Sequence, residues 1–217
     1  GSYVVKELLD RGEEVRAFVL PREKIPAYVE RNRQSLTRYA GDVCDRQTLD
    51  QLFVTDEDAE FTVIHCAGLI SISLGKNPKV YSVNVDGRAN VIAACREHQV
   101  RRLVYVSSVH AIPVLPRGQV MCEISSFSPD RVVGYYAKTK ALATQMVLDA
   151  AKFGMDALVV HPSGIIGPNA QRSGNVAQMI SAFLKGSFRF LIKGGFDFVD
   201  VRDVAAGIVS AADNGKA

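Results

Sequence analysis

The sequence contains no tryptophan, only four cysteines in 217 residues, and no apolar run near the length of about 18 residues that indicates a membrane helix. Its first residues lack the basic and then apolar order of a signal peptide. The cysteines, Cys44, Cys66, Cys95 and Cys122, form no CxxC pair, so we expect reduced and mostly buried thiols. These absences predict a cytoplasmic protein rather than a secreted or membrane-spanning one.

The chain also lacks a strong excess of one charge. Lysine and arginine number 26 and aspartate and glutamate 23, which gives a formal net charge of +3. The charges are spread along the sequence and form no long basic run. We therefore expect a small-molecule substrate, and neither nucleic acid nor a membrane, as the main partner.

What the chain does have is enough apolar sequence for a core, with 47% hydrophobic residues in one domain or little more. Short β-branched stretches alternate with segments of helical periodicity. Strands are predicted at 14–20, 36–40, 61–66, 102–107, 157–161 and 196–201, and helices at 2–12, 47–53, near 80–98, 132–153, 176–185 and 204–212. Nearly continuous apolar strands are typical of a parallel sheet covered on both faces. The order predicts a doubly wound, Rossmann-like α/β fold.

Both ends of the sequence depart from that pattern. A doubly wound sheet begins with a strand and a glycine-rich turn, whereas the first helix here starts at residue 1 or 2. We interpret Gly1 as the last glycine of that turn rather than as a cloning remnant. We therefore expect the first, central strand and a C-terminal substrate domain to lie outside this chain. Residues 110–130 form the longest irregular piece and are a candidate substrate lid.

The strongest chemical pattern is Tyr136 and Lys140, four residues apart on a predicted helix. Because that spacing places both side chains on one face, the ammonium can favour ionisation of the phenol, which suits acid/base work. A predicted strand ends in Ser107 and Ser108, so a hydroxyl stands at the edge of the sheet where ligands bind. Tyr135 and Lys138 offer a second Tyr and Lys close by and define the register that must be tested.

Five further segments stand in an informative order. They are Gly41-Asp42-Val43-Cys44-Asp45, Val63-Ile64-His65-Cys66-Ala67-Gly68, Asn84-Val85-Asp86-Gly87, His161-Pro162-Ser163-Gly164-Ile165-Ile166-Gly167-Pro168 and Phe198-Val199-Asp200-Val201-Arg202-Asp203-Val204-Ala205. With the Ser, Tyr and Lys above, they resemble the extended short-chain dehydrogenase/reductases, also called the NAD-dependent epimerase/dehydratase family, over essentially the whole chain. One departure is Arg88, where the family usually has threonine.

The resemblance implies an NAD(P)-binding domain over 1–217, with the start of substrate-binding elements from about residue 168. It implies Tyr136 as the acid/base, Lys140 as the group that holds the cofactor ribose and lowers the pKa of the tyrosine, and Ser108 as the partner of the substrate hydroxyl. Ser107, one position earlier, is the alternative candidate for this role. The remaining implied residues are Asn84 in the active site and Gly1, Arg22, Asp42, Val43, Cys66, Ala67, Gly68, Pro162, Ser163 and Ile165, with Tyr136 and Lys140, at the cofactor.

The end of the strand predicted at 14–20, which would be the second strand of the complete fold, influences the choice between NAD and NADP. An acidic residue there binds the adenosine ribose and disfavours a 2′-phosphate. This chain instead has Leu20-Pro21-Arg22, with Lys24 close by. NADP is therefore favoured over NAD.

The four histidines show no metal-ligand spacing, and no metal is expected. Asp203 is interpreted as a helix N-cap. The sequence after Ser108 lacks the VYG that sugar epimerases usually have there. The segment from His161 to Pro168 resembles dihydroflavonol reductase and 3β-hydroxysteroid dehydrogenase relatives, and both features favour net oxidoreduction. A nucleotide-sugar epimerase or dehydratase is the alternative, and a non-catalytic dinucleotide sensor is a third. The resemblance also implies a homodimer formed by the helices near 80–98 and 132–153.

Overall fold

The computed structural model describes residues 1–29, 34–55, 59–72, 75–169, 174–187 and 194–216. Within these residues, parallel strands form three sheets, with the orders β1-β2, β3-β4-β5 and β6-β7. The strands are β1 (Val15–Val19), β2 (Leu36–Ala40), β3 (Thr62–His65), β4 (Arg102–Val106), β5 (Ala157–Val160), β6 (Gly164–Ile166) and β7 (Phe198–Asp200).

Helices connect the strands and cover both faces of the β3-β4-β5 sheet. They are α1 (Ser2–Asp10), α2 (Pro78–Tyr81), α3 (Gly87–Glu97), α4 (Tyr135–Lys152), α5 (Asn175–Leu184) and α6 (Val201–Asn214). A π-helix, Ser82–Asp86, joins α2 to α3, and short 3₁₀ helices span Arg46–Leu52, Val109–Ala111 and Pro129–Arg131.

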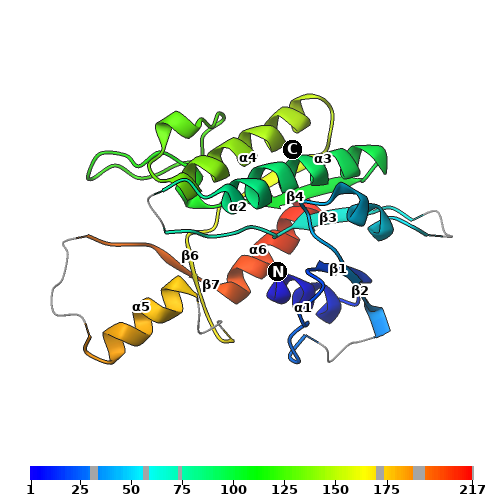
Figure 1. Cartoon of the computed structure of the whole chain (residues 1–217), viewed down its shortest axis with the longest axis horizontal. Helices are drawn as coiled ribbons and strands as arrows, with labels where there is room; N and C mark the ends of the chain where they lie inside the picture. Colours follow the sequence, from blue (N-terminus) through cyan, green and yellow to red (C-terminus); the bar gives the residue numbers. More distant parts are fainter. Residues whose placement is uncertain (30–33, 56–58, 73–74, 170–173, 188–193, 217) are drawn as a thin grey trace.

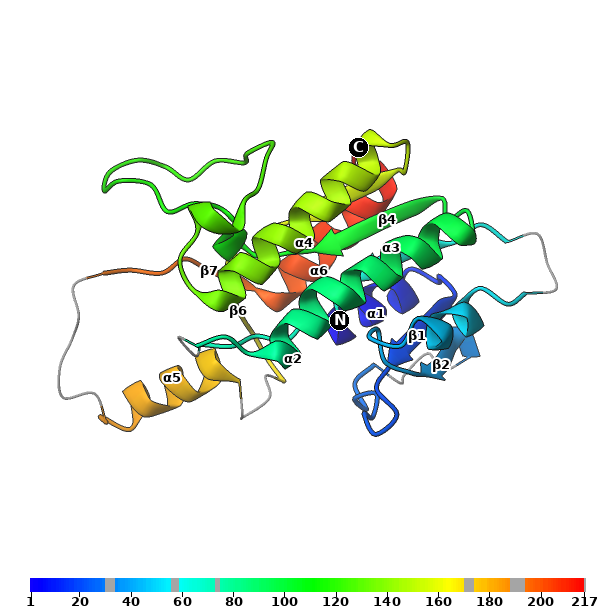
Figure 2. The same cartoon turned by 45° about the horizontal axis from the view of Figure 1, so that its top comes forward.

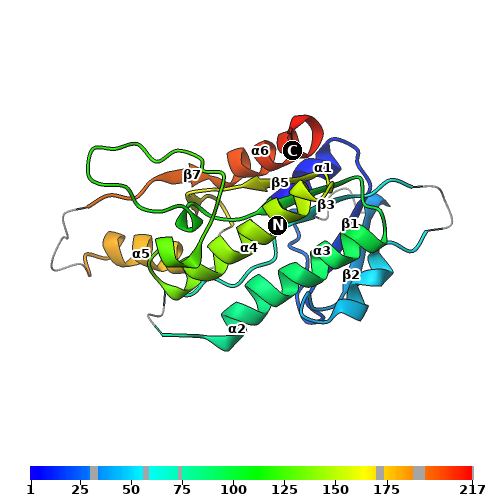
Figure 3. The same cartoon turned by 90° about the horizontal axis from the view of Figure 1, so that it is seen from above.

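The central sheet lies between two helical layers, with α3 and α4 on one face and α1 and α6 on the other (Figure 1, Figure 3). Successive side chains of β4 point to opposite faces of the sheet, so this strand contributes to the hydrophobic core on each face. Leu103 and Tyr105 pack with the α3 and α4 side chains, and Val104 packs with Ile208 and Val209 of α6. All three β4 residues have no exposed surface, as a central strand covered on both faces requires.

The long loop between β4 and α4 extends from the end of the sheet near β6 and β7 (Figure 2). A left-handed glycine, Gly134 at φ +96°, ends this loop immediately before α4. Its conformation is one that side chains rarely adopt, so glycine sets the direction in which Tyr136 enters the helix.

The Rossmann-like α/β class and the order of strands and helices are confirmed. Gly12, at φ +84°, lies in the left-handed region directly after Arg11, the C-cap of α1. Three details were wrong: the sheet is divided, residues 46–52 form a 3₁₀ helix, and β6 was not expected. The N-cap of α6 is also Asp200 rather than Asp203, because Asp200 Oδ1 accepts from Arg202 N at 2.8 Å.

The cysteines are free, but only Cys95 is fully buried, and Cys122 is exposed. The prediction of mostly buried thiols was therefore wrong. No helix in the described ranges is both long and apolar enough to span a bilayer.

Candidate active site

The carboxyl ends of β3, β4 and β5 meet at one edge of their sheet because the parallel register sets the three strands level. Two backbone hydrogen bonds continue this alignment beyond the strands. Ser107 N donates to Val160 O at 2.8 Å, and Val109 N donates to Pro162 O at 3.1 Å. Ligands of open α/β sheets bind at this edge, so the residues that follow the three strands form the candidate site.

The two serines after β4 have different partners. Ser107 Oγ lies 2.7 Å from Thr144 Oγ1 in the buried contact with α4. Ser108 Oγ accepts from His110 N at 3.2 Å, and the Ser108 side chain also acts on the Tyr136 phenol by lowering its pKa. The geometry thus brings Ser108, and not Ser107, to the phenol.

Tyr136 lies half-buried in the first turn of α4, where the ring centroid of His110 is 6.0 Å from its own. Burial raises the pKa of Tyr136 to about 12, and the nearby Ser108 side chain offsets only part of this rise. In this structure Tyr136 is a neutral phenol at neutral pH. It can donate a proton to an oxygen atom placed beside Ser108.

Lys140 has a partner other than the one the sequence suggested. Its Nζ donates to Tyr105 Oη at 3.2 Å and to Val106 O at 3.0 Å. Burial lowers the pKa of Lys140, and Tyr105 partly opposes that effect. The expectation that Lys140 lowers the pKa of Tyr136 is wrong for this structure, since the ammonium is committed to β4.

Asn84 holds the segment after β3 against α4. Its Oδ1 accepts from Leu69 N at 2.8 Å, while Nδ2 donates to Leu69 O at 3.0 Å and to Thr139 Oγ1 at 3.1 Å. Asn84 is 2% exposed and stands in the π-helix, a distortion that is frequent at functional sites. It therefore positions neighbouring groups from within the core.

Gly68 is placed where a side chain would crowd two of these groups. A Cβ atom there would be 3.4 Å from Asn84 Oδ1 and 3.5 Å from Lys140 Nζ. Ala67 and Gly68 are exposed, so this short segment combines accessible backbone with a nearby ammonium. The structure thus brings together Gly68, Asn84 and Lys140 as the sequence suggested.

Gly1 approaches the same segment from α1. A Cβ atom on Gly1 would lie 3.5 Å from Cys66 Cβ, and Gly1 O accepts from Val5 N at 3.0 Å in the first turn of the helix. The end of β3 therefore meets the N-terminus of α1, whose free N–H groups favour anionic groups.

Asp42 and Val43 differ in accessibility. Asp42 is half-buried and its Oδ1 accepts from Cys44 N at 2.9 Å. Val43 is 7% exposed and packs against Gly87, where a Cβ would come within 2.8 Å of Val43 Cγ2. The side chain of Val43 belongs to the core, which leaves its backbone as the part that a cofactor can meet.

The segment after β5 contributes Pro162 and Ser163, both half-buried, and Ile165 on β6, which is 40% exposed. Pro162 O is already bonded to Val109 N, so this carbonyl ties the two loops together. Beyond Ile165 an apolar cavity of about 480 Å³ lies between β6 and α5. Its lining includes Ile165, Ile166, Val176, Ile180 and Leu184.

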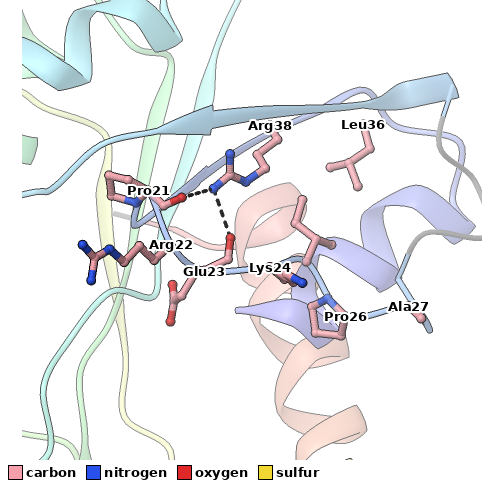
Figure 4. Close-up of a pocket in the computed structure, with 9 residues that line it drawn as sticks. Pro21, Arg22, Glu23, Lys24, Pro26, Ala27, Leu36 and Arg38 are labelled. Carbon is pink, nitrogen blue, oxygen red and sulfur yellow. Dashed lines mark hydrogen bonds between the residues drawn. The ribbon is translucent and has the colours of Figure 1, made fainter.

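Arg22 lines a separate cavity of about 900 Å³ after β1 (Figure 4). Arg38 of β2 shapes this cavity, because its Nη2 donates to the carbonyl oxygens of Pro21 and Glu23, both at 3.0 Å. In Figure 4 the Arg22 side chain extends away from Arg38. Arg22 and Lys24 are exposed, so two cationic side chains border the cavity.

Tyr105 and Arg88 are buried groups at the site that the sequence did not assign. The Arg88 guanidinium carbon lies 3.4 Å from the Tyr105 ring centroid. The position of Tyr105, two residues before Ser107 on the same side of a strand, is a signal that points toward α4. Arg88 was noticed as a departure in the sequence, but its partner required the fold.

One group of metal-ligand types lies together in the described part of the chain: Asp50, Glu97 and His98. Arg46 bonds both carboxylates, at 2.6 Å in the case of Asp50, and His98 Nε2 lies 2.9 Å from Asp50 Oδ1. These contacts use Asp50 Oδ1 twice and Glu97 Oε2 once. The cluster is explained as an ion-pair network rather than as a metal centre.

Known proteins similar to this chain include one family model and several relatives that match nearly all of its length. The model of the NAD dependent epimerase/dehydratase family matches residues 1–217. Sterol demethylase protein B of Methylococcus capsulatus is 34% identical over 215 residues, which are 99% of this chain and 63% of the relative. The decarboxylating sterol-4-alpha-carboxylate 3-dehydrogenase of Mus musculus is 30% identical over 224 residues, 99% of this chain and 56% of the relative.

A solved structure adds a fold comparison. The UDP-glucose 4-epimerase of Thermus thermophilus, in complex with NAD, matches with a TM-score of 0.78 and 24% identity, covering 100% of this chain and 72% of the other. The chain spans less than two thirds of the length of the two curated relatives above.

Proposed function

The chain belongs to the NAD dependent epimerase/dehydratase family, and from that premise we propose that it transfers a hydride between a nicotinamide cofactor and a carbonyl or secondary alcohol. The observation that carries the proposal is the placement of the Ser108 side chain beside the Tyr136 phenol, whose pKa it lowers, at the ligand-binding edge. Lys140 lies one helical turn further along α4. The nicotinamide, when bound, supplies or accepts the hydride.

In this proposal Ser108 holds the substrate oxygen, and Tyr136 gives its phenolic proton to that oxygen during reduction. The pKa of Tyr136 near 12 keeps the phenol protonated and so supports the reductive direction. Lys140 holds the cofactor ribose. The open backbone at Gly68, next to Lys140 Nζ, fits that role.

We assign NADP as the preferred cofactor. Arg22 and Lys24 border the cavity after β1, and a 2′-phosphate is a ligand that such cations favour. Glu23 also lines this cavity and is the one side chain of opposite charge there, while its backbone oxygen accepts from Arg38. The preference therefore depends on the arginine and is tested through it.

Net oxidoreduction is favoured over epimerisation of a nucleotide sugar by one observation. The cavity between β6 and α5 is lined mainly by aliphatic side chains, which suit an apolar substrate better than a sugar with many hydroxyls. A sugar epimerase or dehydratase remains the second candidate, and the fold neighbour with NAD is of that type. A non-catalytic sensor would bind cofactor without turnover.

The homodimer is also part of the proposal, but α4 alone, and not α3 with α4, supplies its apolar surface. Val91, Ile92, Ala94 and Cys95 of α3 are buried within this chain. On α4, Leu142, Met146 and Leu148 keep partial exposure, so this helix is the one of the two that offers large apolar side chains to a partner. Light scattering at micromolar concentration tests the assembly, and a monomer would contradict it.

The proposed reaction is tested by titrating the protein with NADPH and NADH, and by following cofactor oxidation with apolar ketones and with nucleotide sugars. Saturable binding and oxidation with a ketone support the reductase. Turnover of a nucleotide sugar without net cofactor oxidation would assign the epimerase instead. Binding without any turnover would indicate the sensor.

A further inference from the structure

Three polar side chains from three elements meet in the core between the sheet and the helices α3 and α4. Arg88, Tyr105 and Lys140 are 1%, 0% and 5% exposed. Lys140 Nζ donates to Tyr105 Oη at 3.2 Å, and the Arg88 guanidinium lies over the face of the same ring at 3.4 Å. Burying two cations is costly unless a partner compensates them, and Tyr105 contacts both.

Arg88 has no obvious reason to be in the core apart from this contact. Its Nε and Nη1 atoms are buried without a hydrogen-bond partner among the residues described. An arginine in that condition is normally selected against, because each unpaired donor costs free energy. Its stacking on Tyr105 is therefore the interaction that accounts for its place.

The other titratable groups around the phenol come from neighbouring elements. His65 at the end of β3 has its ring centroid 6.1 Å from that of Tyr105, and its pKa is held well below the usual range by burial and by the two cations. Tyr136 is influenced by Tyr105 in turn. Cys66 and Cys95 act on the Arg88 guanidinium.

Two of the three N–H donors of the Lys140 ammonium are used within the protein, and one is left. An ammonium has three N–H donors, and here one goes to Tyr105 and another to Val106 O. The Nζ atom also lies beside the open backbone of Gly68. The two acceptors on β4 thus fix the nitrogen next to the segment assigned to the cofactor.

We propose that Tyr105 is the residue that positions Lys140 so that its third N–H meets a ribose hydroxyl of the cofactor, and that Arg88 holds the Tyr105 ring for this task. The part that concerns the cofactor rests on the proposed function. The part that concerns the three side chains stands without it.

A spectroscopic signature follows from the cluster. Burial raises the pKa of Tyr105, but Lys140 and Arg88 together bring it below its ordinary value. The sequence has seven tyrosines and no tryptophan, so tyrosinate formation can be followed by ultraviolet difference absorption without an indole background. One tyrosine should ionise earlier than the others as pH rises.

The first experiment titrates the protein without cofactor. Tyr105→Phe should abolish the early transition, Arg88→Thr should move it to higher pH, and Arg88→Lys should keep it low by keeping a cation. Tyr39→Phe, on β2 in another sheet, is the control and should leave it in place. An early transition that survives Tyr105→Phe, or that ignores Arg88→Thr while circular dichroism shows a folded protein, overturns the proposal.

The second experiment measures cofactor binding by calorimetry. Tyr105→Phe keeps the ring and removes one acceptor, so affinity for NADPH should fall by about two- to tenfold, the equivalent of one hydrogen bond. Unchanged affinity would show that Tyr105 does not position Lys140. If the wild-type protein binds no cofactor, the proposed function fails, and the titration still decides whether the cluster exists.

Discussion

The hydroxyl groups of Ser107 and Thr144 form a 2.7 Å hydrogen bond inside the contact between β4 and α4, where the two residues are 5% and 0% exposed. Thr144 Oγ1 also donates to Lys140 O at 2.8 Å, so the pair joins the strand to the helix backbone. Ser107 thereby becomes a structural residue, and the neighbouring serine is left for chemistry.

Alanine substitutions of Ser107 and Ser108 should have different effects on turnover. Ser107→Ala should lower the free energy of unfolding by about 1 kcal/mol through the lost hydrogen bond, with turnover close to wild type. Ser108→Ala should lower kcat with little change in cofactor affinity, and its loss of stability should be of similar size because the bond from His110 N is lost. Urea unfolding and steady-state kinetics on both variants check this. The reverse pattern would mean that the serines have been assigned in the wrong order.

Tyr136→Phe should lower turnover by about 100-fold or more, because it removes the transferable proton while preserving the shape of the ring. Cofactor affinity should stay near that of the wild type. Single-turnover kinetics and a binding titration make the measurement. Tyr135→Phe is the matched control, and loss of activity in that variant alone would show that the neighbouring tyrosine is the acid.

Arg22→Ala should weaken NADPH about tenfold or more relative to NADH, since a charge-assisted hydrogen bond to a phosphate contributes about 1.5–3 kcal/mol. Calorimetric titration with each cofactor provides the ratio. Arg96→Ala removes an exposed arginine in the last turn of α3 and serves as the charge-matched control. An equal loss for NADPH and NADH would remove Arg22 from the 2′-phosphate site.

His161 should make the fold sensitive to acid. Its ring stacks on Phe127 at 5.2 Å, and burial lowers its pKa from 6.5 to about 4. Because the unfolded chain takes up the proton first, stability is complete above pH 6.5 and decreases as pH falls toward 4. The loss between about pH 7 and pH 5 should be roughly 1–2 kcal/mol.

Urea unfolding of wild type and His161→Leu at the two pH values measures this contribution. The variant should lose less stability on acidification, with the remainder assigned in part to His65, whose pKa is also lowered by burial. An identical pH dependence in both proteins would contradict the assignment to His161.

Local sequence signals were sufficient for the strands and for the edge where they end. The run from Leu103 to Val106 is apolar without a break, and such a run has few alternatives to a buried parallel strand. Tyr136 could be located from helix spacing and the two serines from the end of a predicted strand, whereas Asn84 and the choice of Ser108 came from the family resemblance.

The partner of Lys140 could not be predicted in the same way. A spacing of four residues shows only that Tyr136 and Lys140 share a helix face. The lysine side chain is long enough for its nitrogen to reach acceptors on β4 instead, and the sequence does not show which of them it binds. Arg88 had to be placed in three dimensions before its contact with Tyr105 emerged. The division of the sheet and the Asp200 cap likewise depend on packing and loop geometry rather than on local propensity.

The π-helix from Ser82 to Asp86 makes the number of residues in this segment as important as their identity. One residue fewer would let this stretch close as a regular α-helix, without the wide turn that now holds the extra residue and places Asn84. Asn84 would then leave the backbone of Leu69 and the hydroxyl of Thr139. Substitutions can be absorbed along this helix, but a single-codon deletion within 82–86 should uncouple the segment after β3 from α4.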